Sequence, residues 1–367
     1  MIGLLALLAV SGASEVLVEA GCVLCHTVPE LPAAPRQDAC TGCHQWIRTV
    51  AADPAKRERA MAYFPLWERY ESSVASYLSV PSLEAARARL EPDWVIGWLS
   101  DPHDVRPGLA EGMPRFLLNE TQEEAIRGWF MAGQHTPPPS PPPDSARAEE
   151  GAALYQQRGC PACHSRGAQV AQPGDPAAPD LAHAGARMSA DMLAAWIQDP
   201  SSVSAEATMP TLGLGAGEAL AIRDYLLLTE PGGVAPAAVG PLPEPVARPV
   251  AWAEVEERVF GRICVHCHMD PAQNQGRAGP GNAGGFGWPA AGVQLQTREG
   301  VMAAADRIPD ALARRRHEGR RDTLAAGQRP AELERPERPG MPLGLPPLSD
   351  EDIALVLGWI AQGMPAQ

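Results

Sequence analysis

The sequence predicts a mainly α-helical protein of three small helical modules joined by proline-rich linkers, with an insertion in the first module. Three observations predict this class. One five-residue cysteine pattern occurs four times, two proline-rich stretches divide the chain, and a helical segment of the first part reappears in the second without a gap. Proline lacks the amide donor of a helix interior, and runs of proline favour extended, semi-rigid spacers. The proline-rich stretches therefore mark boundaries.

These boundaries define the predicted modules. Residues 136–145 and 231–250 are the linkers, and they separate the first module (14–135), the middle module (146–230) and the third module (251–367). Each module is small for a hydrophobic core of its own, and aromatic residues make up only 5% of the chain. A large apolar group bound inside each module would supply the missing hydrophobic mass.

All eight cysteines fall within the pattern Cys-x-x-Cys-His. Its four copies contain Cys22, Cys25 and His26; Cys40, Cys43 and His44; Cys160, Cys163 and His164; and Cys264, Cys267 and His268. Two thiols at this spacing can form thioethers to porphyrin vinyl groups while the adjacent imidazole ligates the iron. Zinc sites and thioredoxin-type pairs also use Cys-x-x-Cys, but neither requires the histidine that follows in all four copies. The sequence therefore predicts four covalently bound haem c groups.

The first and middle modules repeat one another. Residues 93–102 match residues 191–200 without a gap, and upstream of these Pro81 corresponds to Pro179. Each of the three modules then has a Met-Pro pair, followed by a segment of helical pattern that carries an aromatic residue. Residues of the type that caps helices precede two of these segments, at Thr121 and Ser349.

With these features the modules resemble class I cytochrome c domains. In that family a helix leads into Cys-x-x-Cys-His, a methionine before proline is the second axial ligand, and a closing helix packs across the first. The resemblance is closest in the middle module. There it implies that Gly151 and Tyr225 form the contact between the crossing helices, and that the Pro179 carbonyl accepts a hydrogen bond from Nδ1 of His164. In the third module it implies Pro280 for this carbonyl.

The resemblance also implies the distal iron ligands, which are Met113, Met209 and Met341. Most methionines are ordinary core residues, but each of these lies between a haem motif and the closing helix and precedes a proline. A thioether stabilises ferrous iron, so a His/Met pair raises the reduction potential above that of a bis-histidine pair.

The first module has two haem motifs but one Met-Pro pair, so the insertion brings in the extra haem. We assign Met113 to the haem of Cys22, because residues 14–20 can form a leading helix whereas residues 29–35, which begin and end with proline, cannot.

That assignment leaves the haem of Cys40 without an evident distal ligand. Met61 lies near in sequence, while His103 and His135 are chemically better ligands further along the chain. Three alternatives remain for this haem. They are bis-histidine ligation through His103, weak ligation through Met61, and five-coordinate iron that could bind a small molecule.

The charge of the chain bears on its partners. A formal net charge of −14 excludes nucleic acid, whose phosphates require a basic face. Such a surface either keeps the protein dissolved or steers it toward a basic patch on a redox partner. The stretch 314–321 is the one local departure from this acidic balance, because it is rich in arginine. It would form a solvated helix face or a docking patch for an acidic partner.

An apolar run at residues 2–10, followed by Ser11-Gly12-Ala13, predicts a signal peptide at residues 1–13. Haem attachment to cysteine occurs outside the bacterial cytoplasm, so we expect a periplasmic or otherwise extracytoplasmic protein. No other stretch reaches the roughly 18 apolar residues that a membrane span requires, and we expect no transmembrane segment in the mature chain.

Three functions are compatible with these features. The first is an electron carrier that relays electrons between redox proteins, the second is the electron-transfer subunit of a dehydrogenase or oxidase complex, and the third is a haem enzyme such as a peroxidase. An enzyme requires an open iron position and acid or base groups beside it. The sequence supplies no substrate pocket, and iron with His and Met ligands is saturated, so we expect a carrier rather than an enzyme.

Overall fold

The structure is a computed structural model, and it describes residues 12–36, 39–64, 67–71, 74, 80–100, 102, 105–106, 109, 112–167, 178–231, 240–270, 292–318 and 338–367. Over these ranges the chain is helical, as predicted, and contains no β-strand beyond an isolated bridge at Arg166 and Gly167. In the same ranges no helix combines the length and the apolar character needed to cross a bilayer. The predicted signal peptide lies almost wholly outside the described residues.

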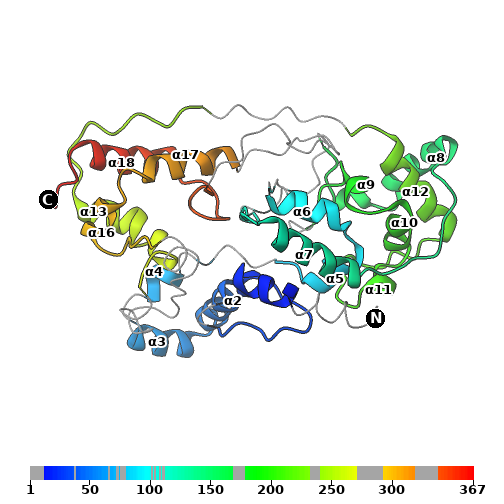
Figure 1. The fold of residues 1–367 in the computed structure, drawn as a ribbon, viewed down its shortest axis with the longest axis horizontal. Helices are drawn as coiled ribbons and strands as arrows, with labels where there is room; N and C mark the ends of the chain where they lie inside the picture. The colour runs from blue at the N-terminus through cyan, green and yellow to red at the C-terminus, as the bar shows by residue number, and fades with distance from the viewer. Residues whose placement is uncertain are drawn as a thin grey trace.

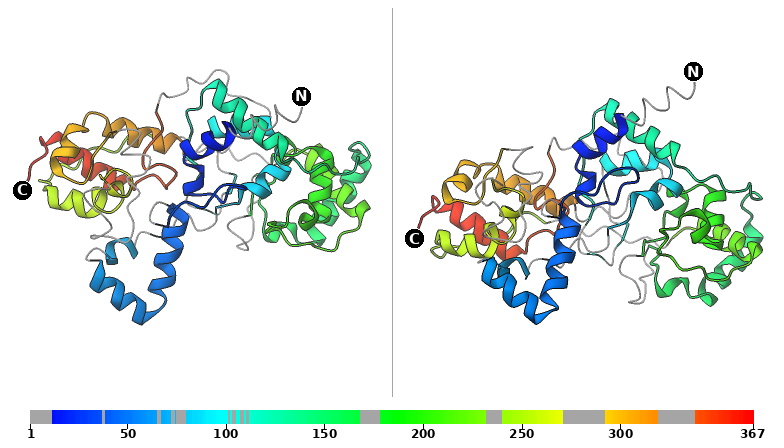
Figure 2. Two further views of the ribbon diagram at one scale, coloured as in Figure 1. Left: turned by 60° about the horizontal axis from the view of Figure 1, so that its bottom comes forward. Right: turned by 90° about the horizontal axis from the view of Figure 1, so that it is seen from below.

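The first module begins with a helix at residues 12–19, and Figures 1 and 2 show that this module lies between the other two. Its further elements are η1 (Cys22–Leu24), α2 (Cys40–Ala51), α3 (Pro54–Tyr63), α4 (Trp67–Glu71), α5 (Leu83–Arg89), α6 (Pro92–Ser100) and α7 (Glu120–Ala132). The middle module has α8 (Ser145–Gln157), η2 (Cys160–Ala162), α9 (Ala184–Arg187), α10 (Ala190–Gln198), α11 (Pro200–Val203) and α12 (Ala216–Leu228). The third has α13 (Trp252–Val255), η3 (Glu256–Phe260), η4 (Cys264–His266), α16 (Arg298–Ala303), α17 (Ile308–Glu318) and α18 (Asp350–Ala361).

Local signals account for several helix starts. The Ser349 side chain accepts from the Asp352 amide and caps α18, as predicted. The cap of α7 is Asn119 rather than Thr121: the Asn119 side chain accepts from the Gln122 amide, and the Gln122 side chain accepts from the Asn119 amide. This reciprocal box starts the helix before Thr121 can act as a cap.

Among the described residues, each module has a hydrophobic cluster. One lies in the first module around Leu17 and Trp129, one mainly in the middle module around Tyr155 and Ile222, and one in the third around Trp359. The helices α2 to α4 bury a separate small cluster. Its centre is Trp67, which is 1% exposed. The inserted segment therefore packs around a core of its own.

In the middle module α8 crosses α12, and the crossing differs from the predicted one. A Cβ atom on Gly151 would lie 1.9 Å from the carbonyl oxygen of Ala221, so the two backbones meet at Gly151 and Ala221. The ring of Tyr225 instead packs against Tyr155, with centroids 5.3 Å apart. The glycine makes the close approach possible, and the aromatic pair fills the space beside it.

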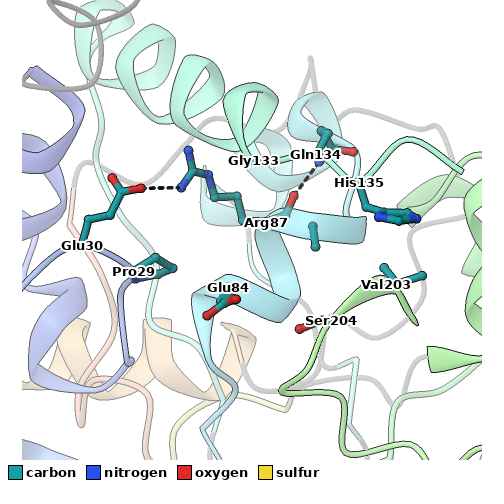
Figure 3. A pocket seen from close by; sticks show the side chains of 10 residues that line it. Pro29, Glu30, Glu84, Arg87, Gly133, Gln134, His135, Val203 and Ser204 are labelled. Atoms are coloured by element: carbon teal, nitrogen blue, oxygen red, sulfur yellow. Dashed lines mark hydrogen bonds and ion pairs between the residues drawn. The ribbon is translucent and has the colours of Figure 1, made fainter. Parts of the chain in front are cut away.

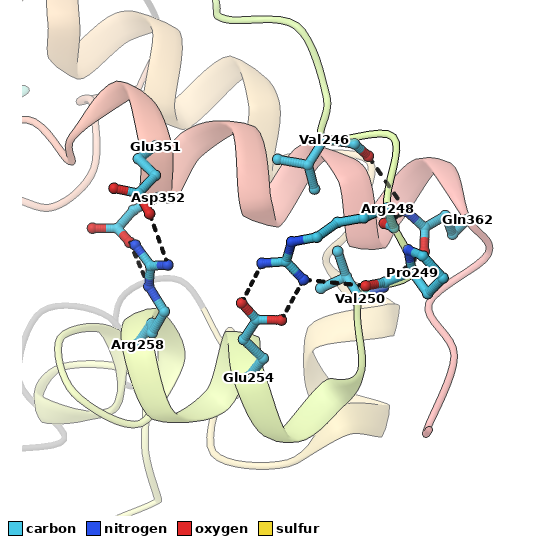
Figure 4. Close-up of polar contacts among 9 residues, drawn as sticks. All are labelled: Val246, Arg248, Pro249, Val250, Glu254, Arg258, Glu351, Asp352 and Gln362. Carbon is cyan, nitrogen blue, oxygen red and sulfur yellow. Dashed lines mark hydrogen bonds and ion pairs between the residues drawn. The ribbon is translucent and has the colours of Figure 1, made fainter.

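Both predicted linkers lie against a module along their described residues. In the first, the Ser140 amide donates to Asp191, and the Asp144 amide donates to Asp224. In the second, the Val246 amide donates to the Ala354 carbonyl of α18, and a Cβ on Gly358 would lie 2.5 Å from Val246. Figure 4 shows that the Gln362 side chain also contacts the main chain of Val246. The linkers are extended but held by side-chain contacts.

Candidate haem-binding sites

Three of the cysteine motifs form the same tight turn. A short 3₁₀ segment begins at Cys22, Cys160 and Cys264, and in each the amide of the motif histidine donates to the carbonyl of the first cysteine. Gly21 and Gly159 precede the first two with φ of 74° and 75°, a left-handed conformation that favours glycine. The turn therefore gathers two thiols and an imidazole within five residues.

The imidazoles of these three motifs are oriented by backbone carbonyls. The Nδ1–H of His164 donates to the Pro179 carbonyl at 2.8 Å, as predicted, and that of His26 donates to Pro81 at 2.7 Å. In the third module the acceptor is Val293, 3.1 Å from Nδ1 of His268, while Pro280 lies outside the described residues. Such a bond fixes the tautomer and leaves Nε2 for a metal. Burial also lowers the pKa of His26 and His268, which keeps both rings neutral.

A mainly apolar cavity of about 340 Å³ joins the first and middle modules. It brings together predicted haem residues of both, namely Cys22, Cys25, His26 and Met113 with Cys160, Cys163, His164 and Met209. Leu17, Trp98 and Trp196 are among the side chains that complete the wall. Both predicted methionines thus line the same cavity as the two motifs, and their pairing with individual motifs stays a prediction.

The chemistry of this cavity fits haem. Each half offers two thiols, an imidazole and a thioether inside a largely apolar wall. Tyr155 also lines this wall, and its buried hydroxyl has no hydrogen-bond partner among the described residues, so a bound group with a polar edge could satisfy it. Burial raises the pKa of Cys22 to about 11, and thioether formation would remove that ionisable group altogether.

In the third module burial raises the pKa of Cys264 and of Cys267 to about 12. Met341 is held by its amide, which donates to the Ala311 carbonyl of α17. The preceding Gly340 lies so close to α17 that a Cβ would be 2.2 Å from the Arg315 amide nitrogen. These contacts fix the Met-Pro loop against α17, and the ligand role of Met341 stays a prediction.

The Cys40 motif is built differently, because it lies within the regular helix α2 rather than in a 3₁₀ turn. Of its candidate ligands, Met61 on α3 is 37% exposed, and His103 lies outside the described residues. His135 lines another cavity, described below. The sequence pattern of Cys40 thus matches the other motifs, whereas its backbone does not.

The Cys40 motif touches the Cys22 motif directly. The thiols of Cys25 and Cys40 are hydrogen-bonded, which raises the pKa of Cys25 and lowers that of Cys40. The Thr41 hydroxyl donates to the Cys25 carbonyl at 3.2 Å. Cys267 of the third module is close enough to raise the pKa of Cys25 electrostatically. Thiols of three motifs therefore gather at one place.

Sequence reasoning did not identify three arginines in the wall of the shared cavity, which are Arg89, Arg106 and Arg187. Two of them carried a signal, because Arg89 and Arg187 each lie eight residues after the proline that holds a motif histidine. An arginine at the same position in two repeats could have identified this position as part of the site.

A second, polar cavity of about 390 Å³ also lies between the first and middle modules, and Figure 3 shows residues that line it. The buried Arg87 guanidinium donates to the Trp129 carbonyl at 2.7 Å and lies 3.9 Å from Glu30. His135 is in the wall, and its amide donates to Ala88. The side chain of Arg87 is thus satisfied by the first module itself.

Two residues of the basic stretch at 314–321 are buried, so they belong neither to the predicted solvated helix face nor to the predicted docking patch. Arg315 and Arg316 are 6% and 8% exposed. Arg315 donates to the Leu345 carbonyl at 2.6 Å, and Arg316 donates to the Pro241 carbonyl at 2.7 Å. These two guanidinium groups therefore hold a loop of the third module and the second linker.

Residues 148–227 match the family model of cytochrome c. No curated protein and no solved structure matches the chain. The matched residues include the Cys160 motif, Pro179 and Met209, and they run from within α8 to within α12. This family binds haem c covalently and serves in electron transport. The chain therefore contains a c-type cytochrome module at residues 148–227.

Proposed function

We propose that the protein is a tetrahaem c-type cytochrome that relays electrons between redox partners outside the cytoplasm. Its modules would be residues 14–135, with two haems, and residues 146–230 and 251–367, with one each. The observation that carries the proposal is the shared cavity, in which the motifs of Cys22 and Cys160 line one mainly apolar space. Two separate carriers on a tether would not need a common cavity.

Each bound haem would supply a one-electron couple, and the residues of the chain set its attachment and its potential. The paired cysteines would anchor the porphyrin, and the carbonyls of Pro81, Pro179 and Val293 hold the proximal imidazoles in one tautomer. Met113, Met209 and Met341 would be the distal ligands and would favour the ferrous state. The mainly apolar walls around the first and middle sites would limit the contact of a bound haem with water, which would favour a high potential.

Contacts between the modules support an order of transfer from middle to first to third, or the reverse. The middle and first motifs share a cavity, and the first module also touches the third near both Met-Pro pairs, where the Gly112 amide donates to the Gly344 carbonyl at 2.8 Å. The Cys40 thiol contacts Cys25 and acts electrostatically on Cys267. The haem of Cys40 would therefore lie between the first and third sites.

The proposal also covers export and partners. A signal peptide would direct the chain across the membrane before haem attachment. The helix at 12–19 buries Ala13 completely, so a cut within 11–13 would pass through its first turn. A net charge of −14 would steer the mature protein toward redox proteins with basic docking surfaces.

The haem count tests the proposal. Intact-mass measurement of the denatured, purified protein should show four covalently attached haems. The variant with Cys160→Ser and Cys163→Ser should show three, and the same exchange at Cys264 and Cys267 should also show three. A wild-type mass that corresponds to fewer than four haems would contradict the tetrahaem assignment.

A further inference from the structure

Two cationic side chains of the shared cavity lack a partner of opposite charge. Arg187 is 6% exposed, and Arg89 is half-buried and lines the cavity. Among the described residues neither makes an ion pair with a carboxylate. Asp180, the nearest acidic influence on Arg187, has its carboxylate bound by the Ser165 hydroxyl at 2.6 Å and by the Ala182 amide. Among the described residues, the guanidinium of Arg187 hydrogen-bonds to the main-chain carbonyl of Asp180 and to no side chain.

The two arginines face each other across the boundary between modules. Arg89 ends α5 of the first module, yet its guanidinium lies over the ring of Trp196 in the middle module, 4.7 Å from the ring centroid. The Arg187 carbonyl in turn accepts from the amide of Glu91 in the first module at 2.8 Å. Each arginine is thus held by contacts with the other module as well as its own.

Their charges repel. The pKa of both Arg89 and Arg187 is lowered to about 10, mainly by burial, and the charges of Arg187 and Arg106 contribute to the lowering for Arg89. Positive groups gathered in an apolar cavity are unfavourable unless an anion compensates them. Arg87 in the neighbouring cavity shows the contrast, because it faces Glu30 and donates to a carbonyl.

We infer that Arg89 and Arg187 form one carboxylate-binding site, shared by the first and middle modules, that takes propionate groups of the haems attached at Cys22 and Cys160. The inference rests on the proposed function, since it requires both haems. A haem carries two propionates, and the planar guanidinium fork binds a carboxylate through two parallel N–H bonds. The cavity that holds both motifs also holds both arginines, so the carboxylates of two haems can reach one site.

A shared site couples the two redox centres. A propionate without a partner favours ferric iron, because its negative charge offsets the extra positive charge of the oxidised state. The arginines neutralise the propionates and so raise the reduction potential. Because the site is shared, removal of either arginine charge should change the reduction potentials of both haems.

The test is a spectroelectrochemical titration of the holoprotein with Arg89→Gln or Arg187→Gln. Each variant should lower two of the haem potentials, the same two in both, and leave the others unmoved. Arg127→Gln and Arg158→Gln remove the same charge from pairs with Asp93 and Glu218, away from the cavity, and should leave all potentials unchanged. Arg187→Lys keeps the charge and should retain most of the wild-type potential.

Three results would overturn the inference: no shift in either variant, a shift confined to the haem of the altered module, or an equal shift in Arg187→Lys and Arg187→Gln. The last would mean that Arg187 acts by packing. Haem counts by mass accompany each titration. If a glutamine variant loses haem, the lysine variant decides between charge and packing. A wild-type count below four contradicts the proposed function, whereas four haems with unmoved potentials contradict only the shared site.

Discussion

The Nδ1–H of His26 donates to the carbonyl of Pro81, 2.7 Å away and 55 residues further along the chain. The same bond in the middle module spans 15 residues, from His164 to Pro179. Most of the difference is the segment of α2 to α4, which is inserted in the first module between the Cys22 motif and Pro81. The insertion thus adds a second motif without displacing the carbonyl that orients the first imidazole.

This relationship predicts that the Cys40 haem can be removed alone. In the variant with Cys40→Ser and Cys43→Ser, intact mass should show one haem fewer. The first module's main core contains no residue of α2 to α4, so the Cys22 site should keep its ligands. The methionine-to-iron charge-transfer band should therefore keep its wild-type amplitude. Loss of a second haem would mean that the two sites depend on each other, whereas a weaker band with three haems retained would indicate that a methionine ligates the Cys40 haem.

Contacts that follow a repeated spacing could be predicted from the sequence. The bond from His164 to Pro179 was predictable because the motif and the proline are close in the chain and recur in order. The acceptor for His268 was not, since every residue carries a carbonyl and no side chain marks Val293. Gly151 was identified as a helix-crossing residue, but its partner was wrong, because a sequence pattern does not fix the register between two helices.

Charged residues were the least predictable part of the site. Arg89 and Arg187 look like ordinary residues at the ends of short helices, and only the packing of one module on another brings them together. Arg315 and Arg316 look like a solvated face, yet carbonyls of distant loops accept their N–H groups. Tertiary contacts decide where such side chains lie, and local patterns carry no information about them.

The crossing of α8 and α12 should tolerate no side chain at Gly151. Gly151→Ala would place a methyl group 1.9 Å from the Ala221 carbonyl oxygen and force the helices apart, at a cost of about 3 kcal/mol in the free energy of unfolding. Gly217→Ala in α12 meets nothing within 4 Å and should be neutral or stabilising by about 0.5–1 kcal/mol. Denaturant unfolding of both variants checks the pair, and equal stabilities would refute the close approach.

Docking of the first linker should depend on Ser140. Its hydroxyl donates to Asp191 and accepts from Arg223, so Ser140→Ala should destabilise the middle module by about 1–2 kcal/mol. Limited proteolysis should then cut near Ser140 faster than in the wild type. Ser145→Ala changes an exposed residue at the start of α8 and serves as the control.

The same contact predicts a dependence on pH. Hydrogen bonds from Ser140 hold the pKa of Asp191 below its usual value. A depressed carboxylate pKa adds stability above the unfolded-state pKa, and this stability is lost as the pH falls through the folded-state pKa. The difference in unfolding free energy between wild type and Ser140→Ala should therefore shrink on acidification. A difference that stays constant down to low pH would exclude Asp191 as the partner that matters.

Met209 should set the potential of the middle haem. It lines the shared cavity with His164, and Met209→His should keep the iron six-coordinate while lowering one reduction potential, because imidazole donates more strongly to ferric iron than a thioether does. The other potentials should stay nearly unmoved, and the methionine-to-iron band should lose one contribution. Met192 is the matched control, since it lies 2% exposed in the core of the same module, and Met192→Leu should change neither potential nor band. An unchanged titration for Met209→His would show that Met209 only packs against the cavity wall, and the distal ligand would then have to come from another residue.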